Sequence, residues 1–75
     1  MIQSSYYIIE KEISTGEWYG ISVQGVISFQ DHSYCTKYHS LFFARNAIHS
    51  IRDQYPEYKF RLVEYSLSGE ILEYE

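Results

Sequence analysis

Cysteine is almost absent from this chain of 75 residues, which contains one thiol, Cys35. A single cysteine excludes an internal disulfide, so no covalent cross-link stabilises the domain and a reducing, cytoplasmic setting is expected. The sequence has no apolar run long enough to span a bilayer, and its start lacks the basic and apolar pattern of a signal peptide. We therefore expect a single domain over residues 1–75, without a membrane segment.

Positive charge is also scarce, because six Lys and Arg stand against ten Asp and Glu and give a formal net charge of −4. Such a chain repels phosphate, so a nucleic-acid partner is not expected. Glycine patterns that hold phosphates or dinucleotides are missing from the sequence as well. Aromatic residues are abundant instead, at 19% of the chain. Tyrosines often lie at recognition surfaces, but a small core also needs large side chains, and both explanations stay open.

A helix is predicted over Ser40–Tyr55. Its apolar residues recur at spacings of three and four and share one stripe, formed by Phe43, Ala44, Ala47, Ile48, Ile51 and Tyr55. Ser40 is the expected N-cap, and Pro56 ends the helix because it disfavours helical geometry at the residue before it. A helix of this length is marginal alone, so we expect its stripe to dock on a sheet.

Strands are predicted on both sides of the helix. Their ranges are Ser5–Ile13, Glu17–Val23, Val26–Phe29, Tyr58–Leu67 and Glu70–Tyr74. Turns at Gly16, at Gly25 and at Ser68–Gly69 separate neighbouring strands, although Gly25 is also compatible with a kink in one long strand. Gly20 indicates a bulge or the close approach of another backbone. The order β-β-(β)-α-β-β predicts an α+β domain, with a single helix packed on a four- to five-stranded antiparallel sheet.

One helix covers one face of such a sheet and leaves the second face open. Apolar side chains are nevertheless expected on both faces, from Tyr6, Ile8, Trp18, Tyr19, Val63, Tyr65, Leu72 and Tyr74. An open face with several aromatics usually marks an interaction site, here for a protein target or for a second copy in a homodimer. The residues predicted to contact a partner are Trp18, Tyr19, Tyr34, Tyr38 and Tyr65, with Glu70 and Glu73 steering the chain toward a basic site.

The polar loop predicted over residues 31–39 carries the spacing H-x2-C-x3-H in His32, Cys35 and His39. Thiolate and imidazole ligands at such intervals can hold zinc, but structural zinc sites usually have four ligands and several cysteines. These three residues are therefore weak metal candidates, and we predict no cofactor. A thiol among histidines also suggests nucleophilic catalysis, but no third orienting group can be assigned, and we predict that the chain is not an enzyme.

Two other ligands are compatible with the sequence. An anionic nucleotide could stack on Trp18 and be held by Arg45 or Arg52, although that would require a pocket between subunits. Unpaired bases could stack on the aromatic residues of Tyr58–Arg61, against the repulsion of the acidic C-terminal strand. Both remain alternatives to the binding of a protein.

Four segments together resemble small accessory proteins of tailed bacteriophages. They are YYIIEKE at 6–12, GEWY at 16–19, SLFFARNAI at 40–48 and YKFRLVEYSLSGEIL at 58–72. The resemblance spans most of the chain, and the long 24–39 segment departs from the commoner form. It implies host-takeover or counter-defence work in the host cytoplasm, by binding and blocking a host enzyme or complex, anti-CRISPR proteins being one class of similar size. It implies no catalytic residues.

Overall fold

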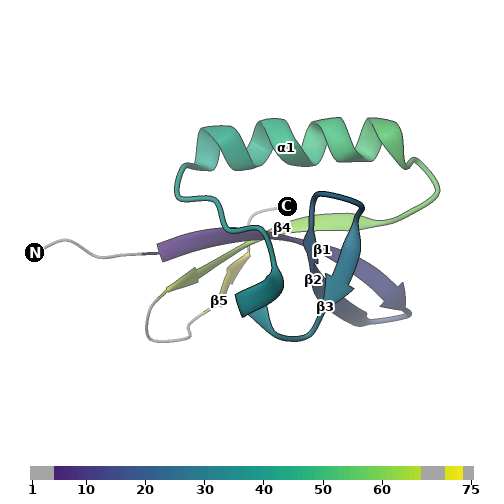
Figure 1. Cartoon of the computed structure of the whole chain (residues 1–75), viewed down its shortest axis with the longest axis horizontal. Helices are drawn as coiled ribbons and strands as arrows, with labels where there is room; N and C mark the ends of the chain where they lie inside the picture. The colour runs from purple at the N-terminus through teal and green to yellow at the C-terminus, as the bar shows by residue number, and fades with distance from the viewer. Residues whose placement is uncertain (1–4, 67–70, 74–75) are drawn as a thin grey trace, which may run out of the picture.

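The computed structural model describes residues 5–66 and, for the backbone alone, residues 71–73. The elements in chain order are β1 (Ser5–Ser14), β2 (Glu17–Ser22), β3 (Ile27–Phe29), the 3-10 helix η1 (His32–Tyr34), α1 (Leu41–Gln54), β4 (Phe60–Ser66) and β5 (Ile71–Glu73). The strands form an antiparallel sheet in the order β3-β2-β1-β4-β5, and α1 lies along one of its faces (Figure 1). The predicted α+β fold class is confirmed.

The ends of α1 follow the sequence signals. The Ser40 hydroxyl accepts a hydrogen bond from the Phe43 backbone amide at 3.5 Å, and α1 ends at Gln54, before Pro56. The buried residues of the helix, Ala44, Ile48 and Ile51, pack against a core that includes Ile9, Ile21, Phe60 and Leu62. The assignment of Phe43 to this stripe was wrong, because its side chain is 63% exposed. Successive helical residues are rotated by about 100°, which turns Phe43 away from Ala44.

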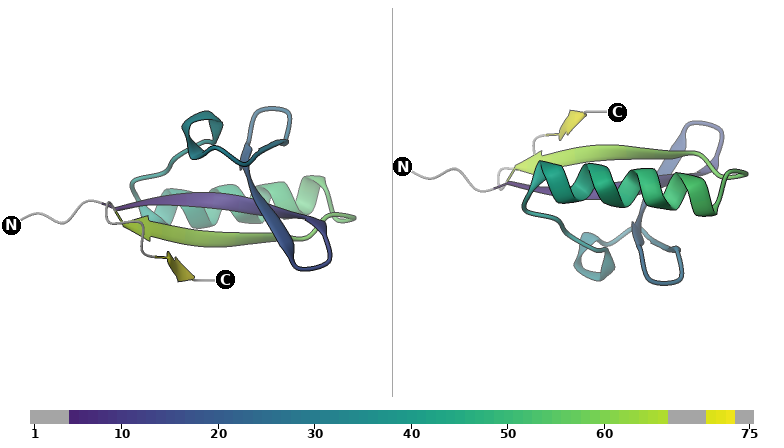
Figure 2. Two further views of the ribbon diagram at one scale, coloured as in Figure 1. Left: turned by 90° about the horizontal axis from the view of Figure 1, so that it is seen from below. Right: turned by 90° about the horizontal axis from the view of Figure 1, so that it is seen from above.

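In the centre of the sheet, β1 and β2 are paired over only part of their length. β1 pairs with β4 from its first residue, but with β2 only from Glu10 onward. Where β2 diverges from β1 (Figure 2), the segment between η1 and α1 contacts both strands. Tyr38 exchanges backbone hydrogen bonds of 2.7 and 2.9 Å with Tyr7, and the Thr36 amide donates to the Ile21 carbonyl at 3.1 Å. The end of the predicted loop is thus hydrogen-bonded into the sheet.

Glycine takes left-handed backbone geometry at two predicted turns. Gly16 has a φ of 79° between β1 and β2, and Gly25 has a φ of 84° between β2 and β3. Gly25 therefore belongs to a turn and not to a kink in one strand. Val26 also has a positive φ of 52°, so β3 begins one residue later than predicted. The third predicted turn, Ser68–Gly69, lies outside the described residues, as does Tyr74.

The sheet face opposite α1 is covered in part, contrary to the prediction of an open face. A second buried cluster on this face joins Ile8, Cys35, Val63 and Tyr65, with Tyr6 and Phe29 packed against it. Cys35 belongs to the segment around η1, which lies on the side of the sheet away from the helix (Figure 1). The sequence pattern missed this packing because residues 31–39 have no strand or helix periodicity.

Candidate functional site

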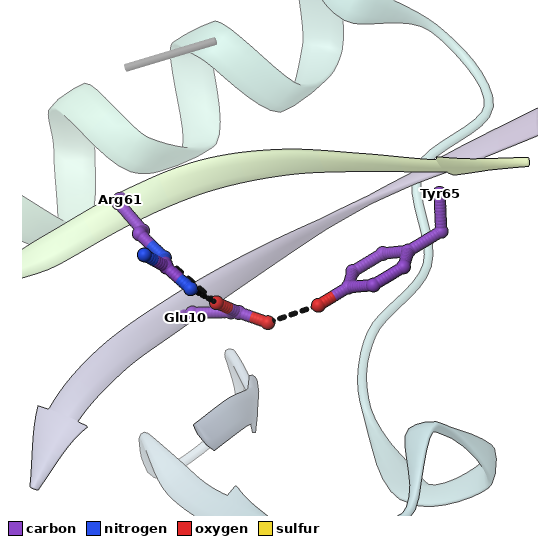
Figure 3. Close-up of polar contacts among 3 residues, drawn as sticks. All are labelled: Glu10, Arg61 and Tyr65. Atoms are coloured by element: carbon purple, nitrogen blue, oxygen red, sulfur yellow. Dashed lines mark hydrogen bonds and ion pairs between the residues drawn. The ribbon is translucent and has the colours of Figure 1, made fainter. Parts of the chain in front are cut away.

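A buried carboxylate lies on the sheet face opposite α1. Glu10 of β1 is 3% exposed, although charged residues are seldom buried without a partner. Its two partners come from β4 (Figure 3): Arg61 places Nε at 2.8 Å and Nη2 at 2.7 Å from Oε1, and the Tyr65 hydroxyl donates to Oε2. Each carboxylate oxygen thereby has a partner, as the burial of a charge requires. This three-residue network ties β1 to β4.

The electrostatics of this network keep the Tyr65 hydroxyl protonated. Burial of the ring, followed by the hydrogen bond to Glu10, raises the pKa of Tyr65 well above its ordinary value of 10.0. A neutral hydroxyl donates to the carboxylate, whereas a phenolate beside it would be repelled. Tyr65 was predicted to contact a partner, but its side chain is buried and its hydroxyl is bonded within the chain.

Trp18 extends the network toward solvent. The guanidinium carbon of Arg61 lies 4.5 Å from the centre of the Trp18 ring, a cation–π geometry. Arg61 therefore contacts a carboxylate and an aromatic face at the same time. Trp18, another predicted contact residue, is half-buried in this arrangement and has an intramolecular role before any partner binds.

The segment around η1 is held to the sheet by aromatic contacts. The His32 ring lies edge-on to Tyr65, with centroids 4.4 Å apart, and its Nδ1 is 3.5 Å from the Tyr6 hydroxyl. At the start of η1, the Asp31 carboxylate accepts a hydrogen bond from the Ser33 amide at 2.9 Å, and this bond lowers the pKa of Asp31. These contacts order residues that the sequence presents as a polar loop.

Cys35 fits against the sheet because Gly20 leaves room for it. A Cβ atom built on Gly20 would lie 2.7 Å from the Cys35 Sγ and 3.0 Å from Cγ2 of Ile8. The group that approaches Gly20 closely is therefore the Cys35 side chain, and not another backbone as predicted. The predicted bulge is not at Gly20 either, because the irregular pairing of β1 with β2 lies between Glu12 and Ser14. Burial raises the pKa of the Cys35 thiol, whereas an activated nucleophile needs a lowered one.

The weak metal candidates are separated by their roles. His32 contacts aromatic rings, the Cys35 thiol is buried, and His39 is exposed before α1. In the part of the chain that the structure describes, no three His, Cys, Asp or Glu side chains are grouped so that they could hold a metal ion. The spacing H-x2-C-x3-H therefore does not correspond to a formed ligand set in these residues.

The remaining predicted contact residues do not share one surface. Tyr38 packs against the core beneath α1, and burial raises its pKa. Tyr19 is half-buried and accepts a hydrogen bond from the Gln30 side chain at 2.8 Å. Tyr34 is 65% exposed, with its ring 5.4 Å from that of Phe29. Glu70 lies outside the described residues, as does the side chain of Glu73.

The most exposed large apolar side chains lie close together in the sequence, and two of them, Phe42 and Phe43, were not predicted to contact a partner. Among the described residues these are Tyr34, Phe42 and Phe43, at 65%, 68% and 63% exposure. The rings of Phe42 and Phe43 are in edge-to-face contact, with centroids 5.5 Å apart. On a helical projection Phe42 is displaced by about 160° from the buried Ala44, and this displacement indicates from the sequence that Phe42 is exposed.

Charge is segregated in the same part of the sequence. Residues 32–52, here called the basic segment, contain three Lys and Arg and no Asp or Glu, for a formal charge of +3. The other 54 residues contain three Lys and Arg and ten Asp and Glu, for a formal charge of −7. All three histidines also lie in the basic segment. The exposed aromatics therefore belong to a cationic segment of an acidic protein.

Comparisons of the chain with protein-family models, with curated proteins and with solved structures find no match. Among the described residues, no helix has the length and apolar character needed to cross a bilayer.

Proposed function

We propose that this chain is a non-enzymatic protein-binding module, which recognises its target through the exposed rings of Phe42 and Phe43 at the start of α1. The observation that supports this is the exposure of Phe42 and Phe43, at 68% and 63%, with their rings in contact at the start of α1. Burying one large apolar side chain is worth about 1.5–3 kcal/mol, so exposed rings of this size favour association. A few large aromatic anchors usually supply most of the binding energy of an interface.

The polar groups on the opposite sheet face support binding over chemistry. Glu10, Arg61 and Tyr65 satisfy one another, and buried side-chain nitrogen and oxygen atoms of the described residues all have hydrogen-bond partners. A network whose hydrogen-bonding groups all bond one another stabilises the fold, whereas a reactive side chain needs a hydrogen-bonding position left for a substrate or a pKa shifted toward reactivity. We therefore assign this network to holding β1 against β4.

The resemblance to phage accessory proteins supports a narrower proposal. In it, the module is an inhibitor that binds and blocks a host enzyme or defence complex in the host cytoplasm. A homodimer that buries the same aromatics is the competing outcome.

The test is affinity capture followed by reconstitution. The tagged chain is incubated with bacterial lysate, and the retained protein is purified and recombined with it for size-exclusion chromatography and calorimetry. We expect a defined complex, whose Kd rises at least about tenfold in the double variant Phe42→Ser/Phe43→Ser. The matched control is Tyr58→Ser, since Tyr58 is an exposed aromatic outside the basic segment, at 41% exposure.

Two results would contradict the proposal. The first is that no protein is retained above the level of bare resin. The second is that the chain is a stable dimer in which the same two substitutions produce monomers, because the aromatics would then serve self-association.

A further inference from the structure

The Phe42–Phe43 pair forms a continuous apolar surface at the start of α1. Both residues lie in the first turn, and their rings contact one another at a centroid distance of 5.5 Å. Neither ring belongs to the core, because the buried side of the helix is formed by Ala44, Ile48 and Ile51. The pair is thus held outward by the docking of the helix on the sheet, and folding does not bury it.

The helix position next to the pair is cationic, in an otherwise acidic chain. Arg45 follows Phe42 by three residues, so both lie on neighbouring positions of the helix surface, and His49 lies one turn further along. Asp and Glu are absent from residues 32–52, and all ten lie elsewhere in the sequence. An acidic surface is attracted by Arg45 beside the pair and repelled by the net negative charge of the rest of the chain, and this asymmetry favours approach at the pair.

We propose that the target presents an apolar pocket bordered by Asp and Glu, and that the Phe42–Phe43 pair enters this pocket. This inference rests on the proposed protein-binding function and adds the chemistry of the partner. The rings supply the apolar contact, and Arg45 on the neighbouring helix position selects and orients the acidic border. It reverses the sequence-based expectation of a basic target, which relied on glutamates at the C-terminus.

The number of cations favours a protein over other anionic partners. Proteins that bind duplex DNA by charge neutralise several phosphates, about 6–10 in strongly salt-dependent cases, and lipid-binding basic clusters contain about 4–8 Lys and Arg. The basic segment has three Lys and Arg. Lys37 donates to the His32 backbone carbonyl at 2.6 Å, and Arg52 donates to that of Phe60 at 2.9 Å. So few cations are suited to orienting an apolar anchor, not to neutralising a polyanion.

The test uses an acidic amphipathic peptide as the probe. The isotope-labelled chain is titrated with a synthetic helical peptide of Leu and Glu, and with a peptide in which every Glu is replaced by Lys. We expect backbone amide shifts centred on Phe42, Phe43 and Arg45 with the acidic peptide, and binding at least about tenfold weaker with the basic one. The double variant Phe42→Ser/Phe43→Ser should lose binding while keeping the dispersed spectrum of a folded chain.

A charge-matched pair of variants isolates the position of the charge. Arg45→Glu and Lys59→Glu change the net charge equally, but only Arg45 lies in the basic segment. We expect Arg45→Glu to weaken acidic-peptide binding several-fold more than Lys59→Glu does. Equal effects of the two variants, or equal affinity for the two peptides, would overturn the inference.

The other anionic partners are tested in the same format. Tighter binding of phosphatidylglycerol vesicles or of a single-stranded oligonucleotide through the same two rings would also overturn the inference. If a captured protein binds through the Phe pair but the acidic peptide does not, the proposed function stands and the acidic pocket is wrong. If the acidic peptide binds through the pair but no cellular protein is captured, the surface chemistry stands and the proposed function fails.

Discussion

Replacing Gly20 by alanine is the sharpest test of how the sheet face opposite α1 is covered. In a strand interior, Gly→Ala normally stabilises a protein by about 0.5–1 kcal/mol, because alanine loses less backbone entropy on folding. Gly20 has no left-handed φ that would oppose a side chain. If the segment around η1 did not lie on the sheet, the substitution would therefore be neutral or stabilising.

In the structure, by contrast, Gly20→Ala is expected to destabilise the protein. The added methyl group would lie 2.7 Å from the Cys35 Sγ and 3.0 Å from Cγ2 of Ile8, both shorter than ordinary van der Waals contacts. Overpacking of this kind costs about 1–3 kcal/mol. Set against the backbone gain, Gly20→Ala should lower the free energy of unfolding by about 1–2 kcal/mol, a large part of the roughly 4–11 kcal/mol expected for a chain of this length.

A double-mutant cycle assigns the effect to the thiol. Cys35→Ala removes Sγ and leaves its Cβ 3.6 Å from the new methyl group, an ordinary contact. In the double variant the Gly20 methyl occupies space vacated by sulfur, so we expect a favourable coupling of about 1–2 kcal/mol. Urea unfolding followed by Trp18 fluorescence measures each corner of the cycle. A stabilising Gly20→Ala, or additivity between the two sites, would refute the packing described here.

Three further predictions concern the buried polar groups. Tyr65→Phe deletes a hydrogen bond to the Glu10 carboxylate and should cost about 1.5–3 kcal/mol in urea unfolding, and a cost below about 0.5 kcal/mol would contradict the network. Because the folded state raises the pKa of Tyr65 above 10.0, its contribution should be intact below that pH and decline as the pH rises further. Unfolding measured between pH 8 and 11 should show this decline, reduced in Tyr65→Phe. Buried Cys35, whose pKa is raised, should react with iodoacetamide at least about 100-fold more slowly in the native state than in urea, and equal rates would show that the thiol is accessible.

The helix and the turns could be predicted because their signals are local. Ser40 and Pro56 delimit α1, and Gly16 and Gly25 supply the φ values that their turns require. The predicted apolar stripe of the helix was correct except for Phe43, which is exposed because it is rotated by about 100° from its neighbour Ala44. Such signals depend on neighbours within one turn of backbone, so a single sequence contains them.

The candidate site was harder to predict because its contacts are distant in sequence. Glu10 carries a charge that ordinarily stays in solvent, but Arg61 and Tyr65, which lie 51 and 55 positions away, allow it to be buried. Tyr38 and Tyr65 were expected to contact a partner, and packing encloses them instead. Which tyrosines remain exposed depends on which neighbours the fold brings over them.

The sequence by itself determined the α+β class, the helix with its N-cap, and the turns at Gly16 and Gly25, because these follow from periodicity and from local backbone preferences. It also contains the segregation of charge into residues 32–52, which any count along the chain reveals. Only the tertiary structure decided that Cys35 packs over Gly20, that Glu10 is buried among partners, and that Phe42 and Phe43 face outward. The physical reason is that burial is a property of the surrounding volume, and that volume is filled by residues far away in the chain.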